Sequence, residues 1–285
     1  MLNMLRMDLY RMFRTKSLYV IWIVMAVMVI VTTYLSKTDY DIVTVENKQE
    51  GQAEQSGQSG QETEPVNLGM SVEIPVEPGE KLTLFDIFYA NAQAKFIALF
   101  LAIFAVMFST ADISSGYIKN IGGQVRNRGL LIMSKAVALV VFTILSMLLF
   151  VGALAVGMRI FFRELLWGNV GDFLIYFGIQ LLLHIAFVIL CMTIAVVLRN
   201  NVVSMVIVVC LSMNIMVVLY SAIDKCLQQL GSKEFQTIQY TLTGKISLLS
   251  MAPGGKECAG ALCVATVFGI GLLALCSLIF KKRDI

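Results

Sequence analysis

Charge and histidine are scarce in this chain. Charged residues make up 14% of its 285 residues and hydrophobic residues 58%, whereas about a quarter of an ordinary globular domain is charged. A water-soluble fold is therefore disfavoured. The single histidine, His184, excludes most catalytic triads and every zinc-protease motif that needs two histidines. No metal-ligand spacing occurs, so we expect no cofactor bound by this chain.

The motif that holds ATP phosphates is also missing. Gly244-Lys245 and Gly255-Lys256 lack both the upstream glycine and the following Ser or Thr of a P-loop. No Asp, Glu, Lys or Arg lies in the middle of an apolar block, which disfavours an ion-coupled carrier, a charged pore and an intramembrane protease. We expect no enzyme activity, and any uphill transport would take its energy from another polypeptide.

Long apolar blocks dominate what is present. Each is close to the roughly 20 residues that cross a hydrocarbon core of about 30 Å, and lipid forces such segments to be helical. The sequence therefore predicts an all-α polytopic membrane protein with six transmembrane helices. The first block has no Ala-x-Ala-like cleavage site after it, so we expect it to remain as an anchor. The blocks are 18–35, 96–111, 136–158, 173–198, 202–223 and 258–280.

Basic residues predict how these spans are oriented. The connecting segments on one side carry 12 Lys or Arg against 3 Asp or Glu, and those on the other side carry 10 against 16. Basic segments stay in the cytoplasm, so both termini are predicted to be cytoplasmic and the protein to lie in the cell (plasma) membrane. The inner segments are 1–17, 112–135, 199–201 and 281–285, and the outer ones are 36–95, 159–172 and 224–257.

The first seventeen residues predict an interfacial amphipathic helix. Its apolar stripe would lie in the acyl boundary and its arginines toward anionic headgroups. The alternative is a solvated tail whose periodicity arose by chance. The residues expected at the membrane interface are Leu2, Leu5, Arg6, Leu9, Arg11, Met12 and Arg14.

Two outer segments differ in character. Within the acidic segment 36–95, the Gly/Gln/Ser/Glu tract 51–64 is predicted to be disordered. The apolar stretch 82–89, LTLFDIFY, is expected to lie along the outer surface as a lead-in to the second span. The segment 224–257 carries enough apolar residues to predict short helices that dip back toward the bilayer.

A few polar groups and thiols stand out at the spans. Gln180, His184 and Asn214 lie within apolar blocks, where polar groups are functional candidates by default. For His184 and Asn214 the more economical interpretation is hydrogen bonding to a neighbouring helix. Cys226 and Cys258 fall at the outer ends of adjacent spans, and the sequence leaves open whether they form a disulfide or remain free.

The inner segment 112–135 combines helical spacing with glycines. Ile118 and Ile121 are spaced as on a helix, and glycines at 116, 122, 123 and 129 interrupt it. An acidic residue, Asp112, precedes a Gly-Tyr-Ile-Lys-Asn run, and a basic turn then leads to Lys135 at the start of the third span. This pattern resembles the first cytoplasmic loop of ABC-2-type ABC transporter permeases, and the six spans with an N-terminal amphipathic helix resemble that family over essentially the whole chain.

The resemblance implies that this loop carries a coupling helix seated in a groove of a partner ATPase. Ile118 and Ile121 would form its apolar knob, and the glycines would let it stand at an angle to the spans. The alternative is a basic loop that only obeys the positive-inside rule. The implied coupling helix comprises Ser115, Gly116, Tyr117, Ile118, Lys119, Asn120, Ile121, Gly122 and Gly123, with Asp112, Arg126, Arg128 and Lys135 as hinge and charge residues.

We therefore expect the permease subunit of an ABC exporter. Its implied partners are two cytosolic ATPase subunits, which bind ATP and Mg²⁺, and a second permease copy or homologue. A path between the permeases, lined by the second and fifth spans, favours an amphipathic or hydrophobic solute such as a peptide, an antimicrobial or a lipid-like molecule. The alternative is a non-transporting membrane interaction, immunity or sensor-anchoring protein.

Overall fold

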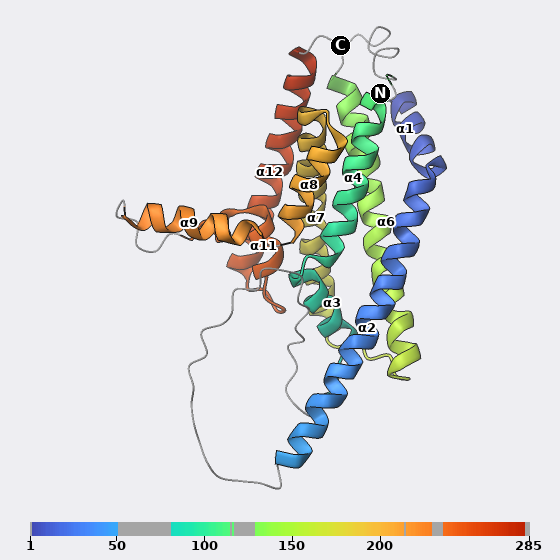
Figure 1. Cartoon of the computed structure of the whole chain (residues 1–285), viewed down its shortest axis with the longest axis vertical. Coiled ribbons are helices and arrows are strands. Elements are labelled where there is room, and N and C mark those ends of the chain that lie inside the picture. Colours follow the sequence, from blue (N-terminus) through green and yellow to red (C-terminus); the bar gives the residue numbers. More distant parts are fainter. Residues whose placement is uncertain are drawn as a thin grey trace.

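The computed structural model describes residues 2–50, 81–114, 116, 129–213, 215–229 and 236–282. The tract 51–64, predicted to be disordered, lies outside these residues. All regular elements of the described residues are helices, and they form an elongated bundle (Figure 1). In chain order they are α1 (Leu2–Arg14), α2 (Lys16–Glu50), α3 (Leu84–Gln93), α4 (Phe96–Ser114), α6 (Gly129–Phe161), α7 (Val170–Leu198), α8 (Asn201–Ser212), α9 (Met216–Gln229), α10 (Thr237–Tyr240), α11 (Leu242–Leu248) and α12 (Gly255–Lys282).

Four helices of the described chain are long and apolar enough to cross a membrane: α2, α6, α7 and α12. Two bent pairs, α3 with α4 and α8 with α9, raise the number to six if each pair is one span. The prediction of an all-α membrane protein is confirmed in this form, with four to six candidate spans. The α8–α9 pair divides the fifth block, where the sequence predicts a single helix, whereas α4 covers the second block and α3 precedes it.

The helix of the second block agrees with the prediction, but a second helix, α3, precedes it at an angle. α3 and α4 meet at an angle of 55°, across a turn in which Lys95 has φ 58° and is 2% exposed. A charged residue is thus buried at a bend that the sequence does not reveal. The lead-in 82–89 does not lie on the outer surface either, because α3 is buried: the Phe88 ring packs against the rings of Phe150 and Phe173.

The fifth block is divided by a sharper bend. α8 and α9 meet at 70°, and α9 projects sideways from the bundle (Figure 1). Two short helices, α10 and α11, follow in the segment where short helices are expected. α11 is fixed to α7 because Gln180 Nε2 donates to the carbonyl of Ile246 at 3.0 Å.

Several helices are longer than their apolar blocks. α2 runs on to Glu50, well into the predicted outer loop. α4 continues to Ser114, and α6 begins at Gly129. Most of what the sequence assigns to the ends of the inner loop is therefore helical, and Asp112 and Lys135 lie within helices. An apolar block predicts only the part of a helix that crosses the lipid, and the helix can extend into the polar residues on either side.

α2 packs closely along α6. Trp22 Nε1 donates to Ser146 Oγ at 2.8 Å, and the Trp22 ring stacks on Phe142 with centroids 6.3 Å apart. Farther along, a Cβ placed at Gly157 would lie 3.2 Å from Thr33 Oγ1. The two helices therefore approach closely where the small residue allows it.

The ends of several helices gather at one end of the bundle. α1, the last turn of α4, the first turn of α6 and the last turn of α12 all lie there (Figure 1). The described parts of the segments that the sequence assigns to the inner side thus share one end of the bundle. This end holds the candidate site.

Candidate functional site

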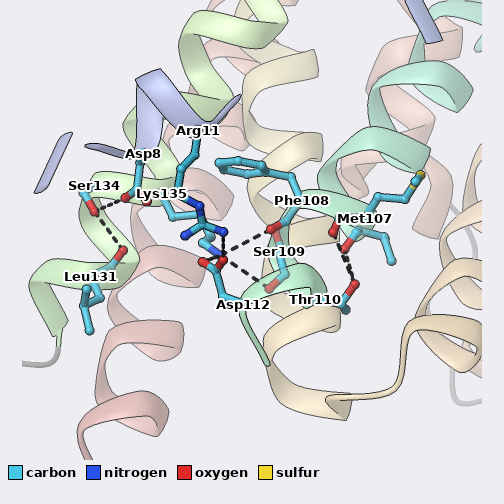
Figure 2. A network of polar contacts seen from close by, with 11 residues as sticks. Asp8, Arg11, Met107, Phe108, Ser109, Thr110, Asp112, Leu131, Ser134 and Lys135 are labelled. Atoms are coloured by element: carbon cyan, nitrogen blue, oxygen red, sulfur yellow. Dashed lines mark hydrogen bonds and ion pairs between the residues drawn. The ribbon is translucent and has the colours of Figure 1, made fainter. Parts of the chain in front are cut away.

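A buried group of charged side chains joins three helices at this end (Figure 2). We call Asp8, Arg11, Asp112, Ser134 and Lys135 the charge cluster. Asp8 and Arg11 come from α1, Asp112 from α4, and Ser134 and Lys135 from α6. Asp8, Asp112, Ser134 and Lys135 are each at most 6% exposed.

α1 places its two members of the cluster on one face. Residues three and four apart share a side of a helix, so Asp8 and Arg11 face the bundle together with Met12, which is fully buried. The structure differs here from the sequence prediction, in which Arg11 and Met12 face headgroups and acyl chains. Instead, Arg11 forms an ion pair with Asp112, and Met12 packs against the bundle.

The other predicted interface residues are less enclosed. Arg6 and Arg14 are exposed, and Leu5 and Leu9 are partly buried, with Leu9 packed against the core. The side chain of Leu2 lies outside the described residues. The outer face of α1 therefore keeps its basic character, while the inner face serves the cluster.

Asp112 and Lys135 form the centre of the cluster. Lys135 Nζ pairs with Asp112 Oδ2, and Arg11 Nη2 pairs with Asp112 Oδ1. Asp112 thus engages one cation through each carboxylate oxygen. The Asp112 and Lys135 side chains are 8% and 6% exposed, so the pair is shielded from solvent, and removing Asp112 would leave Lys135 as a buried charge without its carboxylate partner.

Lys135 is held by more than its ion pair. Its Nζ lies 3.3 Å from the Phe108 carbonyl oxygen and 3.5 Å from that of Ser109, which both lie in α4 one turn before Asp112. The ammonium also lies 5.2 Å from the centre of the Phe108 ring, within the range of cation–π attraction. The start of α6 is therefore attached to the last two turns of α4.

Asp8 adds a second connection between α1 and α6. Ser134 Oγ donates to Asp8 Oδ2 at 2.5 Å, across 126 positions of sequence. Burial raises the pKa of the Asp8 carboxyl; its hydrogen bond with Ser134 and the nearby Lys135 partly offset this rise. Ser134 and Lys135 are adjacent, so α6 meets both α1 and α4 through neighbouring residues.

A fourth helix end is connected next to the cluster. Thr110 Oγ1 donates to Asn201 Oδ1 at 3.1 Å, which links α4 to the first residue of α8. Asn200 caps the same helix, because its side chain accepts from the backbone N–H groups of Val202 and Val203. Four helix ends are thus joined around the last turns of α4.

The structure describes only part of the predicted coupling loop. Asp112 and Lys135, predicted as hinge and charge residues, are brought together. Gly116 has φ +69°, a left-handed conformation suited to glycine just after a helix end. The remaining coupling-loop residues lie outside the described residues: Ser115, Tyr117, Ile118, Lys119, Asn120, Ile121, Gly122, Gly123, Arg126 and Arg128.

The polar candidates within the spans do not join the cluster. Gln180 and His184 are fully buried, and Gln180 donates to the Ile246 carbonyl of the neighbouring helix α11. His184 differs, because its Nδ1 bonds the Gln180 carbonyl of its own helix at 2.7 Å. Asn214 lies outside the described residues. Cys226 and Cys258 are free thiols, so the disulfide that the sequence left open is not formed.

Asp8 and Ser134 are cluster residues that the sequence interpretation missed. One signal was available for Asp8, which is the only acidic residue in the basic segment 1–17. Ser134 gives no such signal, because a serine beside a lysine is ordinary. Nothing local in the sequence indicates that these two residues meet.

The fold and the cluster define a helical membrane protein whose helix ends are joined by buried charges at one end. The chain belongs to the family described as "Protein of unknown function (DUF2705)", which matches residues 59–285. The match includes Asp112, Ser134 and Lys135 and excludes α1. No curated protein matches the chain.

Proposed function

We propose that this chain is the permease subunit of an ABC exporter. It would cross the plasma membrane six times, with both termini cytoplasmic, and pair with a second permease copy or homologue. Two cytosolic ATPase subunits would bind ATP and Mg²⁺ and act on the coupling loop between α4 and α6. The basic character of this end of the chain supports its cytoplasmic placement.

The observation that carries the proposal is the clamp between Asp112 and Lys135. These residues lie 23 positions apart, on either side of the predicted coupling helix, and their side chains pair directly. A force on the loop would otherwise be absorbed by bending at its two ends. With the ends clamped, a displacement of the loop moves the inner ends of α4 and α6 together.

α1 extends this joint. Arg11 binds the same carboxylate as Lys135, and Asp8 accepts from Ser134. Movement of the α4–α6 joint would therefore also move the N-terminal helix. Buried charge pairs have two discrete states, made or broken, and such elements transmit a displacement better than continuously deformable contacts.

Burial excludes α4 from most of the transport path expected between two permease subunits. α4 is enclosed by other helices of the same chain and cannot line an intersubunit route along most of its length. α8 exposes Val202, Val203 and Val206 and remains a candidate lining. Such an apolar wall favours an amphipathic or hydrophobic cargo over a sugar or a small ion.

A pulldown in mild detergent tests the proposal. The full chain is purified from its native host, and the proteins bound to it are identified by mass spectrometry. We expect a P-loop ATPase to be retained. If no such ATPase is found in several detergents, the proposal fails and the interaction-protein alternative gains.

A matched pair of variants locates the coupling contact. Ile118→Asp puts a charge on the predicted knob, and Leu248→Asp puts the same charge on a half-exposed side chain of α11. We expect only Ile118→Asp to reduce ATPase retention, by tenfold or more, since burying an unpaired charge costs several kcal/mol. Equal retention by the two variants would place the coupling contact elsewhere.

A further inference from the structure

α1 has two faces of different chemistry. The inner face carries Asp8 and Met12, both buried against the bundle. At about 100° per residue, Asn3, Arg6 and Tyr10 lie roughly opposite them, and all three are exposed. Since Asp8 is the only acidic residue of α1, the outer face carries cations and no carboxylate.

A shallow concavity lies along this outer face. Its volume is about 520 Å³. Polar groups capable of hydrogen bonding and a guanidinium line one part of it, and apolar side chains line the rest. The lining residues are Asn3, Arg6, Met7, Leu9, Tyr10 and Phe13.

A second cation, Arg14, lies one turn beyond Tyr10, next to the end of the concavity. Arg14 Nη1 lies 3.1 Å from Tyr10 Oη, and the guanidinium carbon lies 5.9 Å from the centre of the Tyr10 ring. Arg6 and Arg14 are eight residues apart, about 12 Å along the helix. They flank Tyr10 from either side and give the outer face two positive charges.

The apolar surface of α2 begins beside Phe13, at one end of the concavity. Tyr19 Oη donates to the Phe13 carbonyl at 2.9 Å, and Tyr19, Val20 and Ile23 are exposed. These side chains belong to a helix long and apolar enough to cross a membrane. The Phe13 end of the concavity thus lies where the apolar surface of the first candidate span begins, and Arg6 lies toward its other end.

We propose that the outer face of α1 binds an anionic phospholipid. Arg6 would pair with the phosphate, Asn3 and Tyr10 would hydrogen-bond to the headgroup, and the acyl chain would follow Phe13 toward α2. Two cations without a carboxylate match an anionic headgroup, and the adjoining apolar lining matches a lipid tail, which a soluble phosphate lacks. Because Asp8 and Arg11 attach the same helix to the charge cluster, an occupied site would hold α1 in place at the joint.

The inference stands without the transport proposal, because it needs only α1 and a membrane. It is tested on the full chain in mild detergent, by native mass spectrometry during titration with phosphatidylglycerol or phosphatidylcholine. We expect phosphatidylglycerol to bind several-fold more tightly. Arg6→Gln should weaken phosphatidylglycerol binding about fivefold, the effect of one cation near a lipid surface, and leave phosphatidylcholine binding unchanged.

A control and a second variant make the result decisive. Lys281→Gln removes one exposed cation from the end of α12 and should change neither affinity; an equal loss with Lys281→Gln would reduce the effect to net charge and overturn the site. Arg14→Gln provides a second variant if Arg6→Gln does not fold. Equal binding of the two lipids by the wild type, or displacement of phosphatidylglycerol by millimolar inorganic phosphate, would also overturn the proposal.

Discussion

Breaking the pair between Asp112 and Lys135 should strongly destabilise the protein. Lys135→Met keeps the length of the side chain and removes its charge, which leaves Asp112 with Arg11 as its remaining cation in the cluster. Loss of one partner of a buried pair costs about 3–5 kcal/mol. At about 2 °C per kcal/mol for a chain of this size, the melting temperature should fall by roughly 6–10 °C.

The double variant separates pairing from packing. Asp112→Asn removes the opposite charge at nearly constant volume and leaves Lys135 buried without its carboxylate. The double variant removes that buried charge as well and leaves only the partly exposed Arg11 without its partner. We expect the double variant to be less destabilised than the sum of the single variants, by about 1.5 kcal/mol or more. Scanning fluorimetry in detergent, using the tryptophan fluorescence of the chain, measures all four proteins.

Two results would refute this reasoning. One is a shift below about 1 °C for both single variants, which would mean that the pair is not formed or is solvated. The other is strict additivity in the double variant, which would mean that the side chains act independently. Thr143→Val, a buried polar change on α6 away from the cluster, controls for general sensitivity of that helix.

Two further predictions concern helix contacts. Because burial raises the pKa of Asp8, its protonated form stabilises the fold at low pH, and this contribution is lost as pH rises from the ordinary Asp pKa of about 4 through the raised pKa. Asp8→Asn cannot ionise and still accepts from Ser134, so over this rise in pH its melting temperature should fall less than that of the wild type, and parallel curves would refute this. Gly157→Leu should lower the free energy of unfolding by about 1–3 kcal/mol, because a side chain at this position meets Thr33 on α2. Gly152→Leu is the control: a Cβ at that position has no neighbouring atom within 4 Å, so the free energy of unfolding should change by less than about 0.5 kcal/mol.

The helical, membrane-spanning character of the chain could be predicted because it depends only on residues that are close together in the sequence. Each apolar block is long enough to cross a bilayer, and a chain in lipid must satisfy its own backbone. The amphipathic N-terminal helix was likewise visible in the spacing of its residues. The spacing does not show which surface the apolar face of this helix contacts. The sequence therefore predicts Met12 in the lipid, whereas the structure buries it inside the bundle.

The charge cluster is the part that only the tertiary structure decided. Arg11 and Asp112 are 101 positions apart, and Asp8 and Ser134 are 126 apart, so no local pattern could pair them. The bend at Lys95 was hidden for a related reason: α3 turns to bury Phe88 among rings from two other helices, and those rings belong to distant segments. Composition and periodicity determined that these segments are helices in a membrane protein, and packing between remote segments decided where they bend and which charges they bring together.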